Sequence, residues 1–231
     1  MKRFYNQVSL AQEDGGHCVL LDARRIKTAA GRPQIVPTRT MAQALAEEWS
    51  AQGEELDNSL FRLRDLADYA IDIVRPDPAA TIAKLLAFIE TDTLCYRADP
   101  EDALYRRQQE IWEPLLTAFE AREDIKLERV CGIIHRTQAS ETSAKLFARL
   151  EVMDDFTLAG LQTLTSLSTS LCVGLSALEN DADPSRLWQA ANLEENWQAE
   201  LWGKDDEAQA NLTRRHQDFQ TGYDFLQLVN A

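Results

Sequence analysis

Residues 156–178 read FTLAGLQTLTSLSTSLCVGLSAL, a run of 23 residues without a charged side chain. The run is long enough to span a bilayer, but hydroxyl and amide groups are scattered through it, and each would need a partner in lipid. Leucines recur at helical spacing, at Leu161, Leu164, Leu167, Leu171, Leu175 and Leu178. We therefore predict one buried helix over residues 155–179, at the centre of a helical domain, and no membrane insertion.

Helical periodicity continues on both sides of this run. Thr40 and Gln43 match a capping box at the start of a helix that ends at Gly53. Asp99-Pro100 matches an N-cap followed by a first-turn proline in another helix, which Pro114 is expected to bend. Further helices are predicted over about 59–74, 140–152, 183–202 and 205–229, and another carries Ile82, Leu85, Leu86 and Ile89 in register. Short extended pieces are predicted over 93–97 and 126–134.

The first forty residues have a different pattern, with short runs of aromatic and β-branched residues between turn residues. These runs predict strands over Arg3–Leu10, His17–Asp22, Ala23–Thr28 and Gln34–Pro37, the first two joined at Glu13-Asp14-Gly15-Gly16. A small antiparallel sheet of this kind needs a helix against its apolar face. The predicted class is α+β, with a β-rich N-terminal domain over 1–57, ending in one helix, and a larger helical domain over 58–231.

The charge of the chain is large and unevenly placed. Its 24 basic and 38 acidic residues give a net charge of −14, which argues against nucleic-acid and anionic-membrane partners. Residues 1–40 hold seven basic and three acidic residues, a net charge of +4, which leaves −18 on the remainder. Residues 181–207 hold eight acidic residues against Arg186 and Lys204. Most of the surface is therefore expected to repel anions.

No catalytic or metal-binding motif stands out. The four cysteines are far apart and form no CxxC pair, which together with the lack of a signal peptide favours a reducing, cytoplasmic compartment. None of the three histidines has a partner at metal-ligand spacing, so we expect no metal and no cofactor. Carboxylate pairs such as Glu90/Asp92 or Glu194/Glu200 leave an acid/base enzyme as a minor alternative. The prediction is a protein that is not an enzyme.

Tryptophans in polar surroundings are the most informative residues. Trp49 and Trp112 lie on the apolar stripes of their helices and are expected to be core anchors, each with its indole N–H on a polar group. Near the C-terminus one helical face carries Ala190, Leu193, Trp197 and Leu201. The adjacent face carries Glu194, Gln198 and Trp202, a combination typical of a protein-binding surface. The alternative is that Trp202 folds back onto the core.

Several short motifs occur in an order that resembles one known family. They are Arg3-Phe4-Tyr5, Leu21-Asp22-Ala23-Arg24 with Lys27-Thr28, Pro37-Thr38, Glu48-Trp49 with Gln52, Ala70-Ile71-Asp72, Thr91 to Arg97, Gln108 with Trp112-Glu113-Pro114-Leu115-Leu116, and Trp202-Gly203. Over nearly the whole chain they resemble the assembly chaperones of ATP synthase that bind the α subunit of the F(1) sector. The residues matched as structural motif positions are Phe4, Tyr5, Asp22, Trp49, Gln52, Asp92, Tyr96, Gln108, Trp112 and Pro114.

The resemblance implies a chaperone that holds the free α subunit, and prevents its aggregation, until the β subunit pairs with it. It also implies a place in the bacterial cytoplasm and an important acidic position, at Glu194 or Glu200. With Gln198 and Trp202, these are the expected partner-binding residues. We further expect the free protein to be a monomer. The sequence departs from the family pattern at Ser59 to Arg62, where a Met-Pro-Leu-Thr stretch is expected, and at Glu113, where aspartate is expected. The alternative function is a helical adaptor for another protein client.

Overall fold

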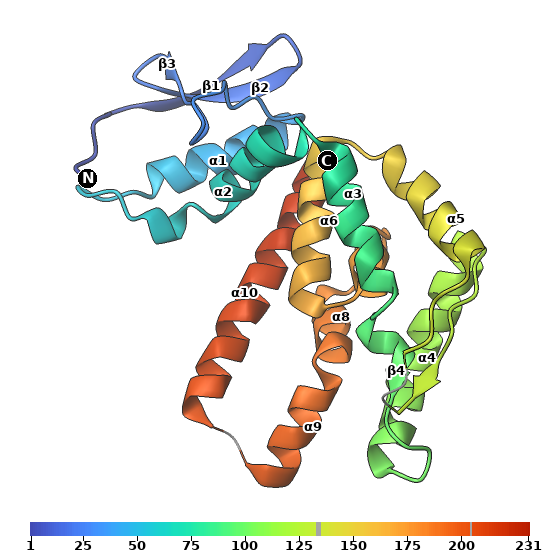
Figure 1. The fold of residues 1–231 in the computed structure, drawn as a ribbon. Helices are drawn as coiled ribbons and strands as arrows, with labels where there is room; N and C mark the ends of the chain where they lie inside the picture. The colour runs from blue at the N-terminus through green and yellow to red at the C-terminus, as the bar shows by residue number, and fades with distance from the viewer. Residues whose placement is uncertain (133–134, 204) are drawn as a thin grey trace. The chain divides into compact units, whose positions relative to one another are not determined.

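The computed structural model describes residues 1–132, 135–203 and 205–231 (Figure 1). A three-stranded antiparallel sheet near the N-terminus is followed by a series of helices, which confirms the predicted α+β class. Contacts divide the chain into two compact units. The first unit comprises Met1–Pro78, Asp154–Gly160 and Thr221–Ala231, and the second comprises Ala79–Met153 and Leu161–Gln220. The division into domains over 1–57 and 58–231 stays a prediction.

The sheet of the first unit is a hairpin with a short third strand. Strand β1 (Val8–Glu13) pairs antiparallel with β2 (Gly16–Leu21), which pairs in turn with β3 (Arg24–Arg25). The predicted first strand began too early, because residues 6 and 7 donate their N–H groups to the carboxylate of Asp22 at 2.8–3.2 Å instead of extending the ladder. The predicted strand over 34–37 is also wrong. Only Val36 pairs there, in an isolated bridge with His17.

Helix α1 (Arg39–Ser50) lies against this hairpin and buries Met41, Leu45 and Trp49. Its N-cap is Thr38, whose hydroxyl oxygen accepts the N–H of Met41 at 3.1 Å, so the predicted capping box at Thr40 is wrong by two residues. The hydroxyl of Thr38 in turn donates to the carbonyl oxygen of Leu228 at 2.6 Å. A contact so distant in sequence leaves no local signal.

The helix predicted over 59–74 is a series of three shorter pieces. They are the 3-10 turn η1 (Asn58–Leu60), helix α2 (Arg62–Tyr69) and the π-helical turn η2 (Ala70–Val74). Phe61 interrupts the first two with φ −92° and ψ 57°. The carboxylate of Glu48 on α1 accepts the N–H groups of Leu63 and Arg64 at 2.7 and 2.9 Å, and so caps the start of α2 from outside.

The remaining elements are mostly helical. They are α3 (Pro78–Ile89), η3 (Thr93–Cys95), β4 (Tyr96–Arg97), α4 (Ala103–Glu123), β5 (Val130–Cys131), α5 (Ser140–Glu151), α6 (Asp155–Ser168), α7 (Leu171–Ser176), α8 (Pro184–Ala191), α9 (Leu193–Trp202) and α10 (Asp206–Val229). The predicted extended pieces shrink to β4 and β5, which pair in parallel, because residues 93–95 form a 3-10 turn. The end of the second piece, Ile134, lies outside the described residues.

Three predicted helices have different bounds in the structure. Helix α4 begins at Ala103 with Asp102 at its N-cap, so the start predicted at Asp99-Pro100 is wrong. The long helix over 155–179 is broken where Thr169 adopts a left-handed φ of 49° and Ser170 caps α7. The helix over 183–202 is broken at Asn192, with φ −105° and ψ 22°.

Four of the six leucines in the stripe that predicted the central helix are buried despite the break, and Leu167 and Leu178 are half-buried. Leu161, Leu164 and Leu171 have no exposed surface, and Leu175 is 2% exposed. Within the described ranges, we find no helix that combines the length and the apolar character needed to cross a membrane.

Candidate partner-binding surface

A groove of about 620 Å³ lies beside α9 in the second unit. Its apolar wall is formed by Ile111 on α4, Leu193 and Trp197 on α9, and Leu212 on α10. The acidic residues that line it are Glu195, Glu200 and Asp205, whereas Arg107 is its one lining cation among the described residues. The groove therefore combines an apolar wall with a predominantly acidic rim.

Two of the three acidic groups already have structural partners. Glu195 forms an ion pair with Arg215 at 3.1 Å, and the Asp205 carboxylate accepts the N–H of Ala208 at 2.8 Å near the start of α10. Glu200 is exposed and has no such contact among the described residues. Glu200 is therefore the one lining carboxylate without a hydrogen-bond or ion-pair partner among the described residues.

Trp202 is the last residue of α9 and lines the same groove. Its side chain is 78% exposed, and the neighbouring Leu201 is 58% exposed, so the alternative in which Trp202 folds back onto the core is wrong. Gly203 follows with φ 90°, a conformation that favours glycine and turns the chain out of the helix. Exposed tryptophans are enriched among the residues that anchor protein–protein interfaces.

The structure brings three of the four predicted partner-binding residues to the groove. Gln198, Glu200 and Trp202 line it. Glu194 lies elsewhere, because its carboxylate accepts a hydrogen bond at 2.6 Å from the side-chain amide of Gln108 on α4. The amide oxygen of Gln108 accepts the N–H of Ala98 at 2.8 Å, so this buried side chain ties α9 to the segment after β4.

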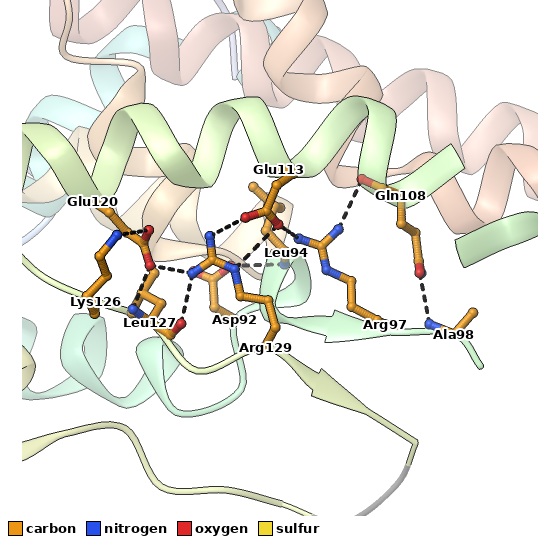
Figure 2. A network of polar contacts seen from close by, with 10 residues as sticks. All are labelled: Asp92, Leu94, Arg97, Ala98, Gln108, Glu113, Glu120, Lys126, Leu127 and Arg129. Atoms are coloured by element: carbon orange, nitrogen blue, oxygen red, sulfur yellow. Dashed lines mark hydrogen bonds and ion pairs between the residues drawn. The ribbon is translucent and has the colours of Figure 1, made fainter. Parts of the chain in front are cut away.

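A network of polar contacts, in which Arg97 and Glu120 are buried, continues from Gln108 along α4 (Figure 2). The side chain of Arg97 has no exposed surface; it donates to the carbonyl oxygen of Gln108 at 3.0 Å and to Glu113 at 3.1 Å. Its guanidinium also lies 5.1 Å from the ring centroid of Trp112. Burial lowers the pKa of Arg97, and the negative charge of Glu113 opposes that shift.

Arg129 joins this pair to a second carboxylate. It donates to Glu113 at 2.8 Å and also pairs with Glu120, which additionally accepts the N–H of Leu127 at 2.8 Å. Burial alone would raise the pKa of Glu120, but hydrogen bonds from Arg129, Leu127 and Lys126 more than offset this and leave that pKa below its usual value. The network fixes β4 and β5 against α4 and leaves these carboxylates committed to structural partners.

Asp92, another motif residue, is a buried capping group. Its carboxylate accepts the N–H groups of Leu94 and Cys172 at 3.1 and 3.0 Å and the hydroxyl of Ser170 at 2.7 Å. Burial raises the pKa of Asp92 even though these hydrogen bonds oppose the shift. With no exposed surface, Asp92 connects η3 to the break between α6 and α7.

The two tryptophans expected in the core are both buried, but their indole groups differ. The N–H of Trp112 donates to the carbonyl oxygen of Ala190 at 2.7 Å, as predicted. The N–H of Trp49 has no hydrogen-bond acceptor among the described residues, so the predicted polar partner is absent there. The carbonyl oxygen of Trp49 accepts the hydroxyl of Tyr5 at 2.6 Å.

The other motif residues are spread over both units. Gln52 accepts the N–H of Asp57 at 2.7 Å, and Tyr96 donates to the carbonyl oxygen of Glu90 at 3.1 Å. Pro114 lies inside α4, and Phe4 is 61% exposed. These contacts do not assemble the motif residues into one site.

Sequence reasoning missed Arg107 and Asp205 as lining residues and missed the bond between Gln108 and Glu194. An isolated arginine in an amphipathic helix carries no distinguishing pattern, and Asp205 is recognisable only as a helix start. In the described part of the chain, no group of three or more histidine, cysteine, aspartate or glutamate side chains is arranged to hold a metal ion.

Comparisons with known proteins identify the chains that this one resembles. Residues 2–120 match the family model described as ATP12 chaperone protein. The crystal structure of Atp12 from Paracoccus denitrificans superposes with a TM-score of 0.94 at 35% identity, covering 99% of this chain and 98% of that one. The Atu1473 protein of Agrobacterium tumefaciens has a TM-score of 0.93 at 34% identity, covering 98% of this chain and 85% of that one. Mitochondrial protein atp12 of Schizosaccharomyces pombe is 25% identical in an alignment of 223 residues that covers 90% of this chain and 75% of that protein.

Proposed function

The chain belongs to the ATP12 chaperone family, and from that premise we propose that it assists assembly of ATP synthase by binding the free α subunit of the F(1) sector. A subunit destined for a ring exposes apolar interface while it is alone, and such patches aggregate. A protein that covers this interface until the β subunit arrives prevents this aggregation. Its affinity has to be moderate so that β displaces it.

The observation that carries the proposal is the exposed Trp202 at the mouth of the groove beside α9. An aromatic anchor next to an apolar wall supplies most of the binding energy in many interfaces. The acidic rim, with Glu200 free of an ion pair among the described residues, orients the partner and excludes anionic competitors. Such an arrangement suits reversible capture of a surface that is apolar at its centre and basic at its edge.

Capture of purified α subunit by immobilised chaperone tests the proposal. Trp202→Ala is expected to weaken capture by about 30-fold, since truncation of an anchor costs about 2 kcal/mol. The matched control is Val152→Ala, because Val152 is exposed to the same 78% in the same unit but lies at the end of α5. Equal capture by the two variants would contradict the assignment of the groove.

Charge reversal separates contact from support. Glu200→Lys is expected to reduce capture without changing the free energy of unfolding, since Glu200 is exposed and unpaired among the described residues. Glu194→Lys is expected to lower the free energy of unfolding, because it removes the acceptor of the Gln108 amide. If instead Glu194→Lys reduced capture and Glu200→Lys lowered the free energy of unfolding, Glu194 would be the carboxylate that contacts the partner.

The same capture experiment addresses the alternative, a helical adaptor for another client. Binding of a different protein through Trp202, with no binding of α subunit, would favour the adaptor. Two of the solved relatives come from bacteria, which supports our proposal that the chain acts in a bacterial cytoplasm. We propose that the free chaperone is a monomer, which the mass measured by light scattering tests.

A further inference from the structure

A second groove, of about 540 Å³, lies in the first unit, beside the turn between β2 and β3. Its floor consists of the buried side chains of Tyr5, Leu21, Ile26 and Trp49. Around it stand cationic residues and the exposed ring of Phe4, which packs edge-on against Tyr5 at 5.4 Å between ring centroids. The groove thus combines an apolar floor with a basic rim.

Two of the three rim cations have no ion-pair partner among the described residues. Arg25 forms an ion pair with Glu13 at 3.1 Å, but Arg24 and Lys27 form no ion pair with any described residue. The carboxylate of Asp22, the only acidic group lining the groove in the described chain, accepts the backbone N–H groups of residues 6 and 7. Two exposed cations are therefore available to an external carboxylate.

The backbone that presents these cations is held in an unusual conformation. Asp22 and Ala23 have φ values of 46° and 66°, in the left-handed region that residues other than glycine seldom adopt. The turn they form leads directly into Arg24 and Arg25 of β3, where backbone pairing with β2 holds the strand. Backbone pairing therefore fixes the point at which the side chain of Arg24 leaves the chain, whereas Lys27 lies two residues beyond β3.

The rim also carries an aromatic side chain. Phe4, 61% exposed on the rim, offers an apolar surface beside the cations. Together the cations and this ring favour a ligand with carboxylate oxygens next to an apolar side chain.

The size and charge of the molecule narrow the class of ligand. A net charge of −14 repels long polyanions and anionic bilayers, whereas a short segment experiences mainly the local basic rim. We propose that this groove binds a short acidic segment of a partner protein, in which aspartate or glutamate flanks an apolar residue, with Arg24 and Lys27 pairing its carboxylates. This site is separate from the groove beside α9 and does not depend on which subunit that groove captures.

Fluorescence anisotropy of the full chain with a labelled peptide tests the proposal. The probe is a short peptide of glutamate and aspartate around one phenylalanine, compared with the same peptide carrying glutamine and asparagine. We expect the acidic peptide to bind at least about tenfold more tightly, and its affinity to fall as the salt concentration rises. Equal binding of the two peptides, or no binding of the acidic one, would overturn the proposal.

Variants locate the binding to this groove. Arg24→Glu combined with Lys27→Glu is expected to lower the affinity for the acidic peptide at least about tenfold. The control combines Arg39→Glu with Lys84→Glu, which changes the net charge equally at exposed positions that do not line the groove. Equal losses in both double variants would show only a net-charge effect and refute the site.

Phe4→Ala is a second, neutral test, expected to weaken binding without changing the salt dependence. An unchanged affinity would remove the apolar part of the proposal. Duplex DNA and phosphatidylglycerol vesicles serve as competitors, and displacement of the peptide by either at equal charge concentration would contradict recognition of an acidic protein segment. Because α subunit is absent from these measurements, their failure is distinguishable from failure of the capture experiment.

Discussion

Gln108 is expected to be one of the most sensitive polar residues of the chain. Its side chain has no exposed surface, and its amide both accepts the N–H of Ala98 and donates to the carboxylate of Glu194. Gln108→Ala removes both hydrogen bonds. A neutral hydrogen bond contributes about 0.5–1.5 kcal/mol and one to a charged group about 1.5–3 kcal/mol. Since Glu194 is half-buried, we take the lower part of these ranges and expect a loss of about 2–3 kcal/mol in the free energy of unfolding.

Urea unfolding followed by circular dichroism measures this loss. The matched control is Gln43→Ala, which removes one exposed hydrogen bond, from Gln43 to Glu47 within α1, and is expected to change the free energy of unfolding by less than about 0.5 kcal/mol. A double-mutant cycle of Gln108→Ala with Glu194→Ala should give a coupling energy of about 1 kcal/mol or more, because the two side chains are in contact. Zero coupling, or a loss no larger than that of the control, would refute the assignment of Glu194 as a supporting residue.

Three further predictions concern stability. Trp112→Phe should cost about 1 kcal/mol more than Trp49→Phe in urea unfolding, because only Trp112 loses a buried hydrogen bond; equal losses would contradict this. Glu120 has a lowered pKa in the folded state, so its contribution to stability is present above its unfolded value of about 4.3 and is lost as the pH falls through the folded value. Below about pH 4.3, the free energy of unfolding of the Glu120→Gln variant should therefore depend less on pH than that of the unaltered chain. Parallel pH profiles of the two proteins would contradict this prediction. Thr38→Ala should cost about 1–2 kcal/mol and Thr40→Ala less than about 0.5 kcal/mol in the same measurement, and the opposite order would restore the cap predicted at Thr40.

The periodicity of the sequence predicted the class of the fold and the place of most elements. Helices over 140–152 and 205–229 match α5 and α10 within one residue at each end. Amphipathic spacing predicts such elements locally, because residues that share one face of a helix or strand recur within a few positions of each other. The hairpin of β1 and β2 is likewise encoded by a local turn, at Gly15 with φ 91°.

The positions where helices break were not predictable in the same way. The break at Thr169 is stabilised by Asp92, which accepts the hydroxyl of Ser170 from 78 residues away. A helical pattern continues through these residues in the sequence, because Leu171 and Leu175 keep the spacing of the stripe. Tertiary hydrogen bonds outweigh that weak local preference, since helix propensities differ by less than about 1 kcal/mol per residue.

The candidate site was likewise predictable from the sequence only in part. The sequence by itself determined that α9 carries an acidic and aromatic face, and its motifs pointed to the chaperone family. Only the tertiary structure decided that Gln198, Glu200 and Trp202 line a groove while Glu194 turns to Gln108, 86 residues earlier in the chain. The physical reason is that residues three or four apart share a helical face, but which neighbour covers that face depends on packing between distant segments.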